Sequence, residues 1–357
     1  GGADGYDRLV IREAKTIEGL ADAEEHVIWD ESEVQGYGRW IWAPELHKIG
    51  DSWYFLSTAS LDETTGGNFN IRPFMMKCNN SEEITNPDSW GEPERVKTMQ
   101  GDKTGLNAMS LDMTYFEAGG RHYLVWADFT KNDGNPAGIS SLYIATIDPS
   151  NPTQLTSTCS VITVPEYVWE LERYKVNEGP AVLQKDGKVY LAFSASGTGS
   201  EYCVGLLTGN ADDDLTKKEN WVKTPYPIMT SGDFNDELCG PGHNSFTVDE
   251  YGNAVIVYHA RPADTHAGHT GDPLYDPCRH AYVKPVLFGA DGAPVLNLSD
   301  EEFVKGGSEI TVKVKVKGES EESKPSLEYN FDEDYTGIVK DSAGNQDGTV
   351  TEGASYV

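Results

Sequence analysis

The feature that most restricts the fold is a strand–turn–strand pattern that occurs four times at regular spacing. Each copy has an apolar run, a turn that contains glycine and a second apolar run, in residues 47–56, 116–126, 183–193 and 248–258. Aligned at their turns, the copies lie about 65 to 70 residues apart. One hairpin repeated at a fixed period is typical of a β-propeller, although this period exceeds the common blade repeat. A β-sandwich with chance similarity between hairpins is the alternative, and the regular recurrence favours the propeller.

The composition agrees with an all-β protein. The 357 residues include 8 Trp, 18 Tyr, 11 Phe and 37 Gly, and aromatic residues are enriched in strands as glycine is in turns. A formal net charge of −30 disfavours nucleic acid and anionic membranes as partners, whereas a neutral polymer tolerates it. No apolar run approaches the ~18 residues of a membrane-spanning helix. The five cysteines form no CxxC pair of the kind that binds zinc.

The third copy follows a carboxylate that two conformationally special residues hold in place. Glu178 stands directly before Gly179 and Pro180, and an Asp-Gly turn between two apolar runs comes next. This pattern predicts a hairpin with Glu178 at the junction between a loop and the first strand. A rigidly placed acid at the mouth of a sheet suits general acid catalysis. The alternative is a surface glutamate in a turn.

Two more polar residues occupy comparable places in the neighbouring copies. Asp112 precedes the first strand of the second copy, and His243 precedes that of the fourth. Equivalent ends of the inner strands of a propeller converge on one face around the axis. Asp112 and Glu178 can therefore meet although 66 residues separate them. An Asx-turn cap is the other possible role of Asp112, and the shared placement favours a common site.

Four motifs together resemble glycoside hydrolase family 43. They are WAPELH at 42–47, SLDMTYF at 110–116, VNEGP at 176–180 and GPGHNS at 240–245. The similarity covers residues 5 to 300 in the expected order and spacing. It implies an all-β fold, a five-bladed β-propeller with an incomplete first blade. It also implies an inverting glycosidase that acts on arabinose- and xylose-containing polymers.

The resemblance assigns roles to single residues. Glu178 would be the general acid, and Asp112 would raise its pKa and orient it. His243 would lie near the axis, where many members hold a calcium ion through this histidine and water; no organic cofactor is implied. Arg279 is a looser match to an arginine that reaches the sugar. Trp42 would form a sugar platform or, equally well, be a core tryptophan.

The catalytic base of the family is an aspartate in an Asp-Pro motif on the first inner strand, and this chain has no match for it. Asp4 is followed by glycine, and the surroundings of Asp7 match the segment after the first hairpin in the family. We therefore expect that the chain lacks the first one or two strands and the base. On this expectation residues 1–357 alone are essentially inactive.

The end of the chain differs in composition from the rest. Residues 310–316 alternate strictly and predict an edge strand, and residues 318–326 form a Glu-, Ser- and Lys-rich linker. Residues 327–357 resemble the truncated start of a laminin-G-like (concanavalin-type) jelly roll. The expected domains are therefore 1–317, the propeller, and 327–357, the start of a second domain.

The sequence predicts an extracellular or cell-surface glycosidase that hydrolyses O-glycosyl bonds. An α-L-arabinofuranosidase acting on plant cell-wall arabinan, arabinoxylan or derived oligosaccharides is the first hypothesis. β-Xylosidase and endo-arabinanase are alternatives within the family, and a non-catalytic carbohydrate-binding propeller is an alternative of another class. An invertase- or levansucrase-like relative is disfavoured by the motifs at 176–180 and 240–245. The sugar, the linkage and exo or endo action stay open.

Overall fold

The computed structural model describes residues 6–30, 37–61, 70–264 and 273–298, together with two short strands at 338–339 and 348–349. The chain divides into two compact units, Gly1–Leu287 and Phe288–Val357. The predicted edge strand, linker and boundary after residue 317 lie outside the described residues, so these stay predictions.

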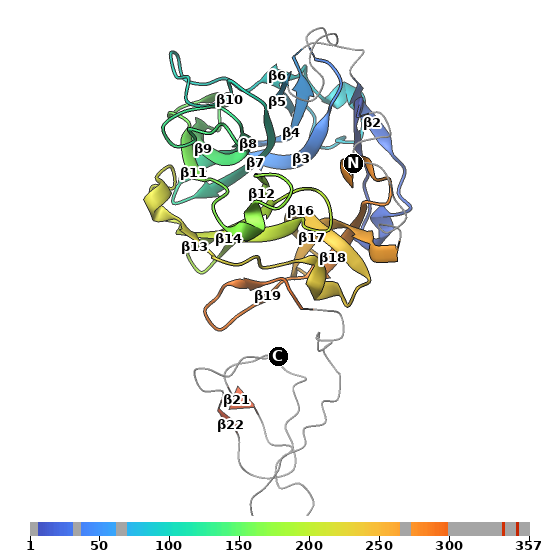
Figure 1. Ribbon diagram of the computed structural model, residues 1–357. Coiled ribbons are helices and arrows are strands. Elements are labelled where there is room, and N and C mark those ends of the chain that lie inside the picture. Colours follow the sequence, from blue (N-terminus) through green and yellow to red (C-terminus); the bar gives the residue numbers. More distant parts are fainter. Residues whose placement is uncertain are drawn as a thin grey trace, which may run out of the picture. The chain divides into compact units, whose positions relative to one another are not determined.

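In the first unit, antiparallel sheets are arranged around a central axis as the blades of a propeller (Figure 1). The two-stranded sheet consists of β1 (Arg8–Ile11) and β2 (His26–Asp30). The next blade has β3 (Trp42–Ile49), β4 (Ser52–Ser60), β5 (Ile71–Lys77) and β6 (Glu94–Arg95). The one after it has β7 (Ser110–Ala118), β8 (Arg121–Asp128), β9 (Ser141–Asp148), β10 (Asn151–Leu155) and β11 (Ser160–Thr163). The last two have β12 (Asn177–Lys185), β13 (Lys188–Ala195), β14 (Cys203–Asn210) and β15 (Val222–Lys223), and β16 (Leu238–Val248), β17 (Ala254–Pro262) and β18 (His280–Pro285).

The described helices are short 3₁₀ segments in the loops between strands. They are η1 (Glu18–Leu20), η3 (Pro87–Ser89), η4 (Val168–Glu170), η5 (Lys218–Asn220), η6 (Ser231–Phe234) and η7 (Pro273–Tyr275). Within the described ranges, none of the helices has the length and apolar character needed to cross a membrane. The strand β19 (Leu287–Phe288), which begins at the last residue of the first unit, pairs with β20 (Pro294–Val295). The second unit also contains the pair β21 (Ile338–Val339) and β22 (Gly348–Thr349).

The prediction of an all-β propeller is confirmed. The four predicted hairpins are the pairs β3–β4, β7–β8, β12–β13 and β16–β17, and β1–β2 occupies a fifth position in the ring (Figure 1). The turn between β12 and β13 has φ of 50° at Asp186 and 74° at Gly187. A two-residue type I′ turn needs positive φ at both central residues, which is why Asp-Gly signalled this hairpin.

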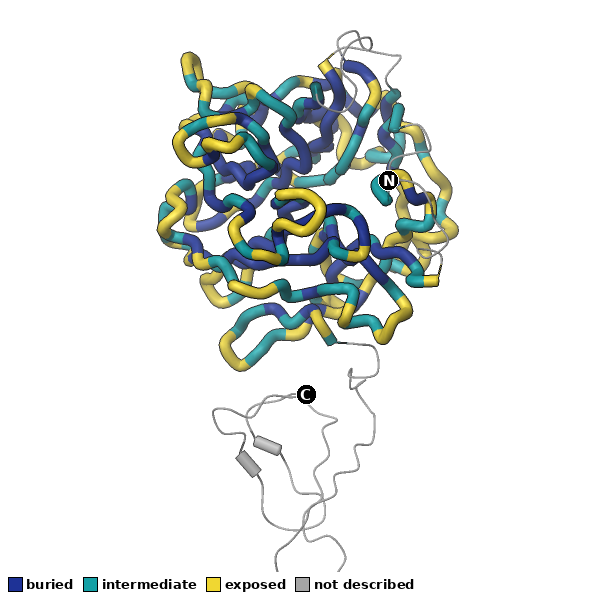
Figure 2. The backbone as a smooth tube through the Cα atoms, viewed as in Figure 1, coloured by how far each residue is buried: buried dark blue, intermediate teal, exposed yellow. Residues whose placement is uncertain are grey.

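The core consists of layers between neighbouring blades, so the second strand of a blade is buried on both faces. In β8, Tyr123 and Val125 pack toward β13, whereas Leu124 and Trp126 pack toward β4 and β5. Side chains of a strand alternate between its two faces, and here both faces are apolar. Figure 2 shows the buried backbone in the sheets and the exposed backbone mainly in the connecting loops. This burial explains why the strand appears in the sequence as an uninterrupted apolar run.

Candidate active site

Each inner strand of these four blades carries a β-bulge at the same place. The register shifts fall between Trp42 and Glu45, Leu111 and Thr114, Glu178 and Ala181, and Gly242 and Ser245. Within them, φ is positive at Ala43 (48°), Asp112 (57°), Gly179 (53°) and His243 (43°). A bulge bends its strand and re-aims the side chains next to it. The repeated bulge is therefore the structural feature that brings side chains of different blades together.

The structure corrects the predicted placement of three site residues. Glu178, Asp112 and His243 were expected ahead of their first strands, but they lie inside them, in β12, β7 and β16. The reason is that strand pairing continues past the bulge, as Asn177 opposite Ala195 shows. Asp112 and His243 hold the same bulge position, whereas Glu178 lies one residue earlier, at the position that Trp42 holds in β3.

Asp112 lies against the inner strands of the next two blades along the chain. Its Oδ2 accepts a hydrogen bond from the backbone N–H of Gly179 at 3.0 Å, and His243 Nδ1 lies 3.9 Å from the same oxygen. A Cβ at position 179 would lie 3.2 Å from His243 Cγ, in a backbone conformation that side chains rarely adopt. Gly179 thus lets three inner strands approach closely, and Asp112 is left only 4% exposed.

Glu178 is a carboxyl group adapted to hold a proton near neutral pH. Burial, and then the charge of Asp112, raise the pKa of Glu178 to about 7, against lowering effects of a Tyr202 hydrogen bond, His243 and Arg279. The Tyr202 hydroxyl donates to Glu178 Oε1 at 2.7 Å. Burial raises the pKa of Tyr202 well above its ordinary value, so this phenol stays a donor. The proton of Glu178 is then directed to its other oxygen.

The pKa of Asp112 is also raised, to about 7. Burial is the main cause of the increase, and the charge of Glu45 adds to it. The hydrogen bond from the Gly179 N–H and the charge of Arg279 lower the pKa in the opposite direction. Two carboxyl groups that interact in this way lose their protons as a coupled pair. Within the pair, the Gly179 N–H favours the charged form of Asp112, and the charge of Asp112 raises the pKa of Glu178. The resemblance implied a pKa-raising role for Asp112, and this arrangement is compatible with it.

Arg279 supplies a positive charge beside these carboxyl groups. Its Nη2 lies 2.6 Å from His259 Nε2, and its Nη1 donates to the carbonyl of Leu274 at 2.9 Å. Burial and the charge of Arg279 lower the pKa of His259 well below its ordinary value. A neutral His259 therefore accepts from the guanidinium, and its ring stacks on Tyr202, the partner of Glu178.

Trp42 lies in a cluster of aromatic rings. Its ring centroid is 5.5 Å from that of Trp40 and 5.9 Å from that of Tyr6, and Tyr6 also contacts Tyr275. The side chain is half-buried. This environment is compatible with both roles predicted for Trp42, a sugar platform and a packing residue.

Neither aspartate near the start of the chain gains support as a base. Asp7 pairs with its neighbour Arg8 at 3.2 Å, and Asp4 lies outside the described residues. The expectation that the base lies upstream stays a prediction.

Sequence reasoning missed four residues of this site. Glu45 stands inside the quoted motif at 42–47 but received no role there. Ser194, which accepts a hydrogen bond from the His243 N–H at 2.6 Å, and His259 both lie in the polar segments that end the second strands. The polar residues that end these apolar runs, at 194–197 and 259–261, are the sequence feature that could have indicated them. Tyr202 precedes β14 without any motif, and only the fold places it against Glu178.

A buried ion pair lies behind the acid. Glu170 is fully buried, and its Oε1 accepts from Lys223 Nζ at 2.6 Å and from Asn177 Nδ2 at 3.0 Å. Its Oε2 accepts from the backbone N–H groups of Glu166 and Tyr167. Because Asn177 is the residue before Glu178, this cluster fixes the entry of the chain into β12. No sequence pattern indicated it.

We expect Glu170→Ala to destabilise the protein by about 3 to 5 kcal/mol, because it leaves the buried ammonium of Lys223 without its partner. Urea unfolding of the variant measures this loss. The matched control is Glu170→Gln combined with Lys223→Met, which removes both charges and should recover most of the stability. A loss under about 1 kcal/mol in Glu170→Ala would show that water replaces the carboxylate.

The comparisons with known proteins agree with this geometry. The family model described as glycosyl hydrolases family 43 matches residues 1–294. The chain belongs to this family. The alpha-L-arabinofuranosidase 43 of Humicola insolens is 39% identical over 292 residues, which cover 81% of this chain and 56% of that protein. An extracellular exo-alpha-(1->5)-L-arabinofuranosidase of Streptomyces avermitilis is 38% identical over 290 residues, with the same two shares.

Solved structures of the family support the fold of this member. The alpha-L-arabinofuranosidase from Lactobacillus brevis superimposes with a TM-score of 0.72 at 38% identity, covering 83% of this chain and 88% of that one. A thermostable family-43 glycoside hydrolase, at 22% identity and a TM-score of 0.60, covers 82% of this chain and 86% of its own and supports the fold alone. This family 43 chain spans about half the length of the curated relatives it matches.

Proposed function

We propose that this family 43 protein is an inverting α-L-arabinofuranosidase with Glu178 as its general acid. The observation that carries the proposal is the buried carboxyl of Glu178 beside Asp112, with one oxygen held by the Tyr202 hydroxyl and a pKa raised to about 7 by burial and by Asp112. The names of the relatives at 38–39% identity support arabinofuranose as the sugar.

In the proposed reaction, Glu178 gives its proton to the glycosidic oxygen as the bond from that oxygen to C1 of the sugar breaks. A water molecule attacks C1 from the opposite face, and a second carboxylate takes the proton that this water loses. The products are arabinose of inverted configuration and the shortened chain. Asp112 keeps Glu178 protonated before the step. Arg279 places a positive charge near the site, where it can hold sugar hydroxyls.

The substrate class is proposed to be neutral plant cell-wall arabinan, arabinoxylan and derived oligosaccharides, and the location extracellular, as in the names of two Streptomyces relatives. A screen on 4-nitrophenyl α-L-arabinofuranoside, 4-nitrophenyl β-D-xyloside and linear arabinan tests this proposal. NMR of the first-formed sugar should show β-arabinofuranose. Faster release from the xyloside would favour a β-xylosidase. Tight sugar binding without hydrolysis would favour a non-catalytic propeller.

Calcium near His243 also belongs to the proposal. The surroundings suit a cation, because Asp112 Oδ2 lies 3.9 Å from His243 Nδ1 and burial lowers the pKa of this histidine, which favours the neutral imidazole that can bind a metal, although the charges of Glu178 and Glu45 oppose that shift. Among the described residues no set of three or more His, Cys, Asp or Glu side chains is arranged to hold a metal directly. His243 and water would therefore hold the ion, and its charge would stabilise the acidic centre of the propeller.

We expect EDTA to lower the melting temperature by about 2 to 4 °C, because removal of the ion leaves the carboxyl groups less compensated. Calcium added in excess should restore the value, and magnesium should not. His243→Ala should abolish the response to EDTA. An unchanged melting temperature after chelation of the wild-type protein would refute the calcium proposal.

We further propose, from the sequence resemblance, that residues 327–357 begin a laminin-G-like module. The short antiparallel pair β21–β22 is the part of that region that the structure describes.

A further inference from the structure

His259 contacts both the tyrosine that supports the general acid and the arginine of the site. It lies in β17, opposite Gly242 of β16. Its ring stacks on that of Tyr202, with centroids 5.5 Å apart and planes inclined by 4°. Its Nε2 lies 2.6 Å from Arg279 Nη2. One imidazole therefore links Arg279 to Tyr202 and, through the Tyr202 hydroxyl, to Glu178.

The ring of Tyr202 is held by the blade that follows its own. Tyr202 is 1% exposed, and a Cβ at position 242 would collide with its ring, which therefore packs directly on the backbone of Gly242. The parallel ring of His259 adds a stacking contact, an arrangement that aromatic rings favour. Because the Tyr202 hydroxyl donates to Glu178 Oε1 at 2.7 Å, the position of the phenol ring sets the position of that oxygen.

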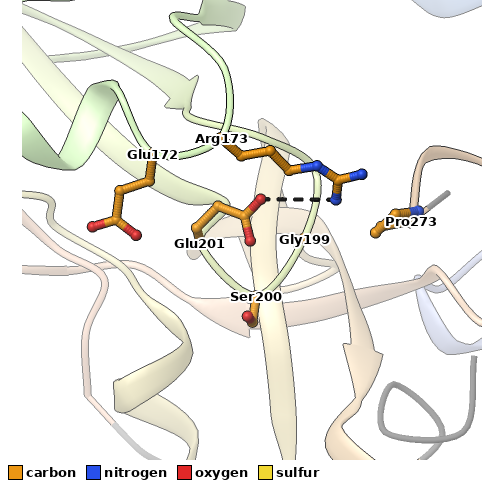
Figure 3. Close-up of a pocket in the computed structure, with 6 residues that line it drawn as sticks. All are labelled: Glu172, Arg173, Gly199, Ser200, Glu201 and Pro273. Carbon is orange, nitrogen blue, oxygen red and sulfur yellow. Dashed lines mark ion pairs between the residues drawn. The ribbon is translucent and has the colours of Figure 1, made fainter.

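The loop that leads into Tyr202 is tied to β16 as well. It borders a cavity of about 530 Å³, which is lined by Glu172, Arg173, Gly199, Ser200, Glu201 and Pro273 (Figure 3). Within this wall, Arg173 and Glu201 form an ion pair at 4.0 Å (Figure 3). Ser231 Oγ donates to the carbonyl of Ser200 at 2.6 Å and accepts from the N–H of Gly240 at 2.9 Å. The backbone before Tyr202 is thus fixed, and the stack with His259 fixes its side chain.

The contact with Arg279 determines where the proton of His259 lies. A guanidinium carries five N–H donors and no acceptor, so Nε2 of His259 accepts and the proton of the ring is on Nδ1. Within the described residues, Nδ1 is buried and has no hydrogen-bond partner. A buried donor without a partner is unfavourable. Stability alone does not explain this histidine, whereas its two contacts with residues of the site do.

Resting on the proposed function, we propose that His259 is a positioning residue with two separable roles. Its ring holds Tyr202, and thereby Glu178 Oε1, so that the other oxygen of the acid is directed to the glycosidic oxygen. Its Nε2 holds the guanidinium of Arg279 where it meets the sugar hydroxyls. The first role acts on the rate of proton transfer, and the second acts on the affinity for the sugar.

Two substitutions in the full-length protein separate these roles. His259→Phe keeps a flat ring for Tyr202 but offers Arg279 no acceptor. His259→Gln presents a carbonyl near the position of Nε2 but removes the ring. Each variant is measured on arabinotriose, whose leaving oxygen needs a proton, and on 2,4-dinitrophenyl α-L-arabinofuranoside, whose leaving group does not.

We expect His259→Phe to raise KM about tenfold on both substrates and to keep the ratio of their kcat values within about twofold. His259→Gln should keep KM within about threefold and lower kcat on arabinotriose about tenfold, while kcat on the dinitrophenyl glycoside changes less than about twofold. Neither KM nor the ratio of two kcat values depends on the amount of folded enzyme, so a partly unfolded variant still decides the question.

Tyr202→Phe should show the same selective loss on arabinotriose as His259→Gln. The double variant should lose no more than Tyr202→Phe alone, because both changes act through one hydroxyl. The matched control is His280→Gln, an exposed histidine on the adjacent strand β18, which should change neither kcat nor KM. Equal losses on both substrates in His259→Gln, additive losses in the double variant or an unchanged KM in His259→Phe would overturn the proposal.

The ¹⁵N NMR signals of the His259 ring, assigned with His259→Gln, test the contact with Arg279 without turnover. We expect the proton on Nδ1, and a proton on Nε2 would overturn the proposal whatever the protein hydrolyses. If the wild-type protein cleaves no arabinofuranoside and the proton is on Nδ1, the enzymatic proposal fails whereas the role of His259 in holding Arg279 is supported.

Discussion

Changing Glu178 to glutamine should lower kcat on arabino-oligosaccharides by about 10²- to 10⁴-fold, because the leaving oxygen then departs without a proton. Glutamine has nearly the same shape as glutamate and can still accept from the Tyr202 hydroxyl at Oε1. We therefore expect the fold and the affinity for sugar to stay close to those of the wild type. Steady-state kinetics on arabinotriose and near-UV circular dichroism measure the two effects.

The matched control for this variant is a substrate whose leaving group needs no proton. A 2,4-dinitrophenolate leaves without protonation, so Glu178→Gln should lose far less activity on the 2,4-dinitrophenyl glycoside than on arabinotriose. The role of Glu178 as the acid is excluded if activity on both substrates falls by the same factor, or if arabinotriose is still hydrolysed at nearly the normal rate.

Changing Asp112 to asparagine should move the alkaline limb of the pH profile of kcat/KM to lower pH. In the wild type this limb is expected near pH 7, because the acid is active only while protonated and its pKa is about 7. The charge of Asp112 raises that pKa, so removing the charge lowers it and activity is lost earlier as pH rises. Activity at pH 7 should fall strongly while activity at pH 5 is better retained. A uniform loss at all pH values would instead indicate a purely structural role.

The same variant should be more stable than the wild type at high pH. The pKa of Asp112 is about 7 in the folded protein and 3.8 in its ordinary state, so its contribution to stability is present at low pH and lost as pH rises through 7. At pH 8, Asp112→Asn should raise the melting temperature by roughly 2 to 4 °C for each kcal/mol relieved. At pH 4 the difference should vanish. Glu117→Gln, an exposed control on the same strand, should show no such dependence.

The sequence predicted the features that depend on local patterns. Asp186-Gly187 between apolar runs marked one hairpin, and the fixed period of four hairpins marked the propeller. Glu178 could be found because Gly179 and Pro180 follow it directly. Asp112 could be found because it occupies a comparable place in its own copy of the repeat. The hydrogen bond from the Gly179 N–H to Asp112 shows that the segments carrying the two acids lie against each other.

The features of the site that could not be predicted from the sequence depend on contacts between distant segments. The bulges that turn Asp112 and His243 toward one another are visible only as interruptions of strand pairing in the folded protein. Because pairing continues past the bulges, Asp112 and Glu178 lie inside their strands and not ahead of them. Tyr202 reaches Glu178 from the loop before another strand of the same blade, β14. Lys223 and Glu170 pair in the core across 53 residues. No local pattern encodes such partners, because burial and charge compensation arise only once the blades are packed.

The most direct test of this account is the titration of Glu178 itself, followed by ¹³C NMR of glutamate carboxyl groups, with Glu178→Gln used to assign the signal. We expect the Glu178 carboxyl to titrate with a pKa of about 7 and to titrate at lower pH in Asp112→Asn. A Glu178 signal that titrates in the ordinary range of an exposed glutamate, and does not respond to Asp112→Asn, would contradict the claim that the two acids form one coupled catalytic pair.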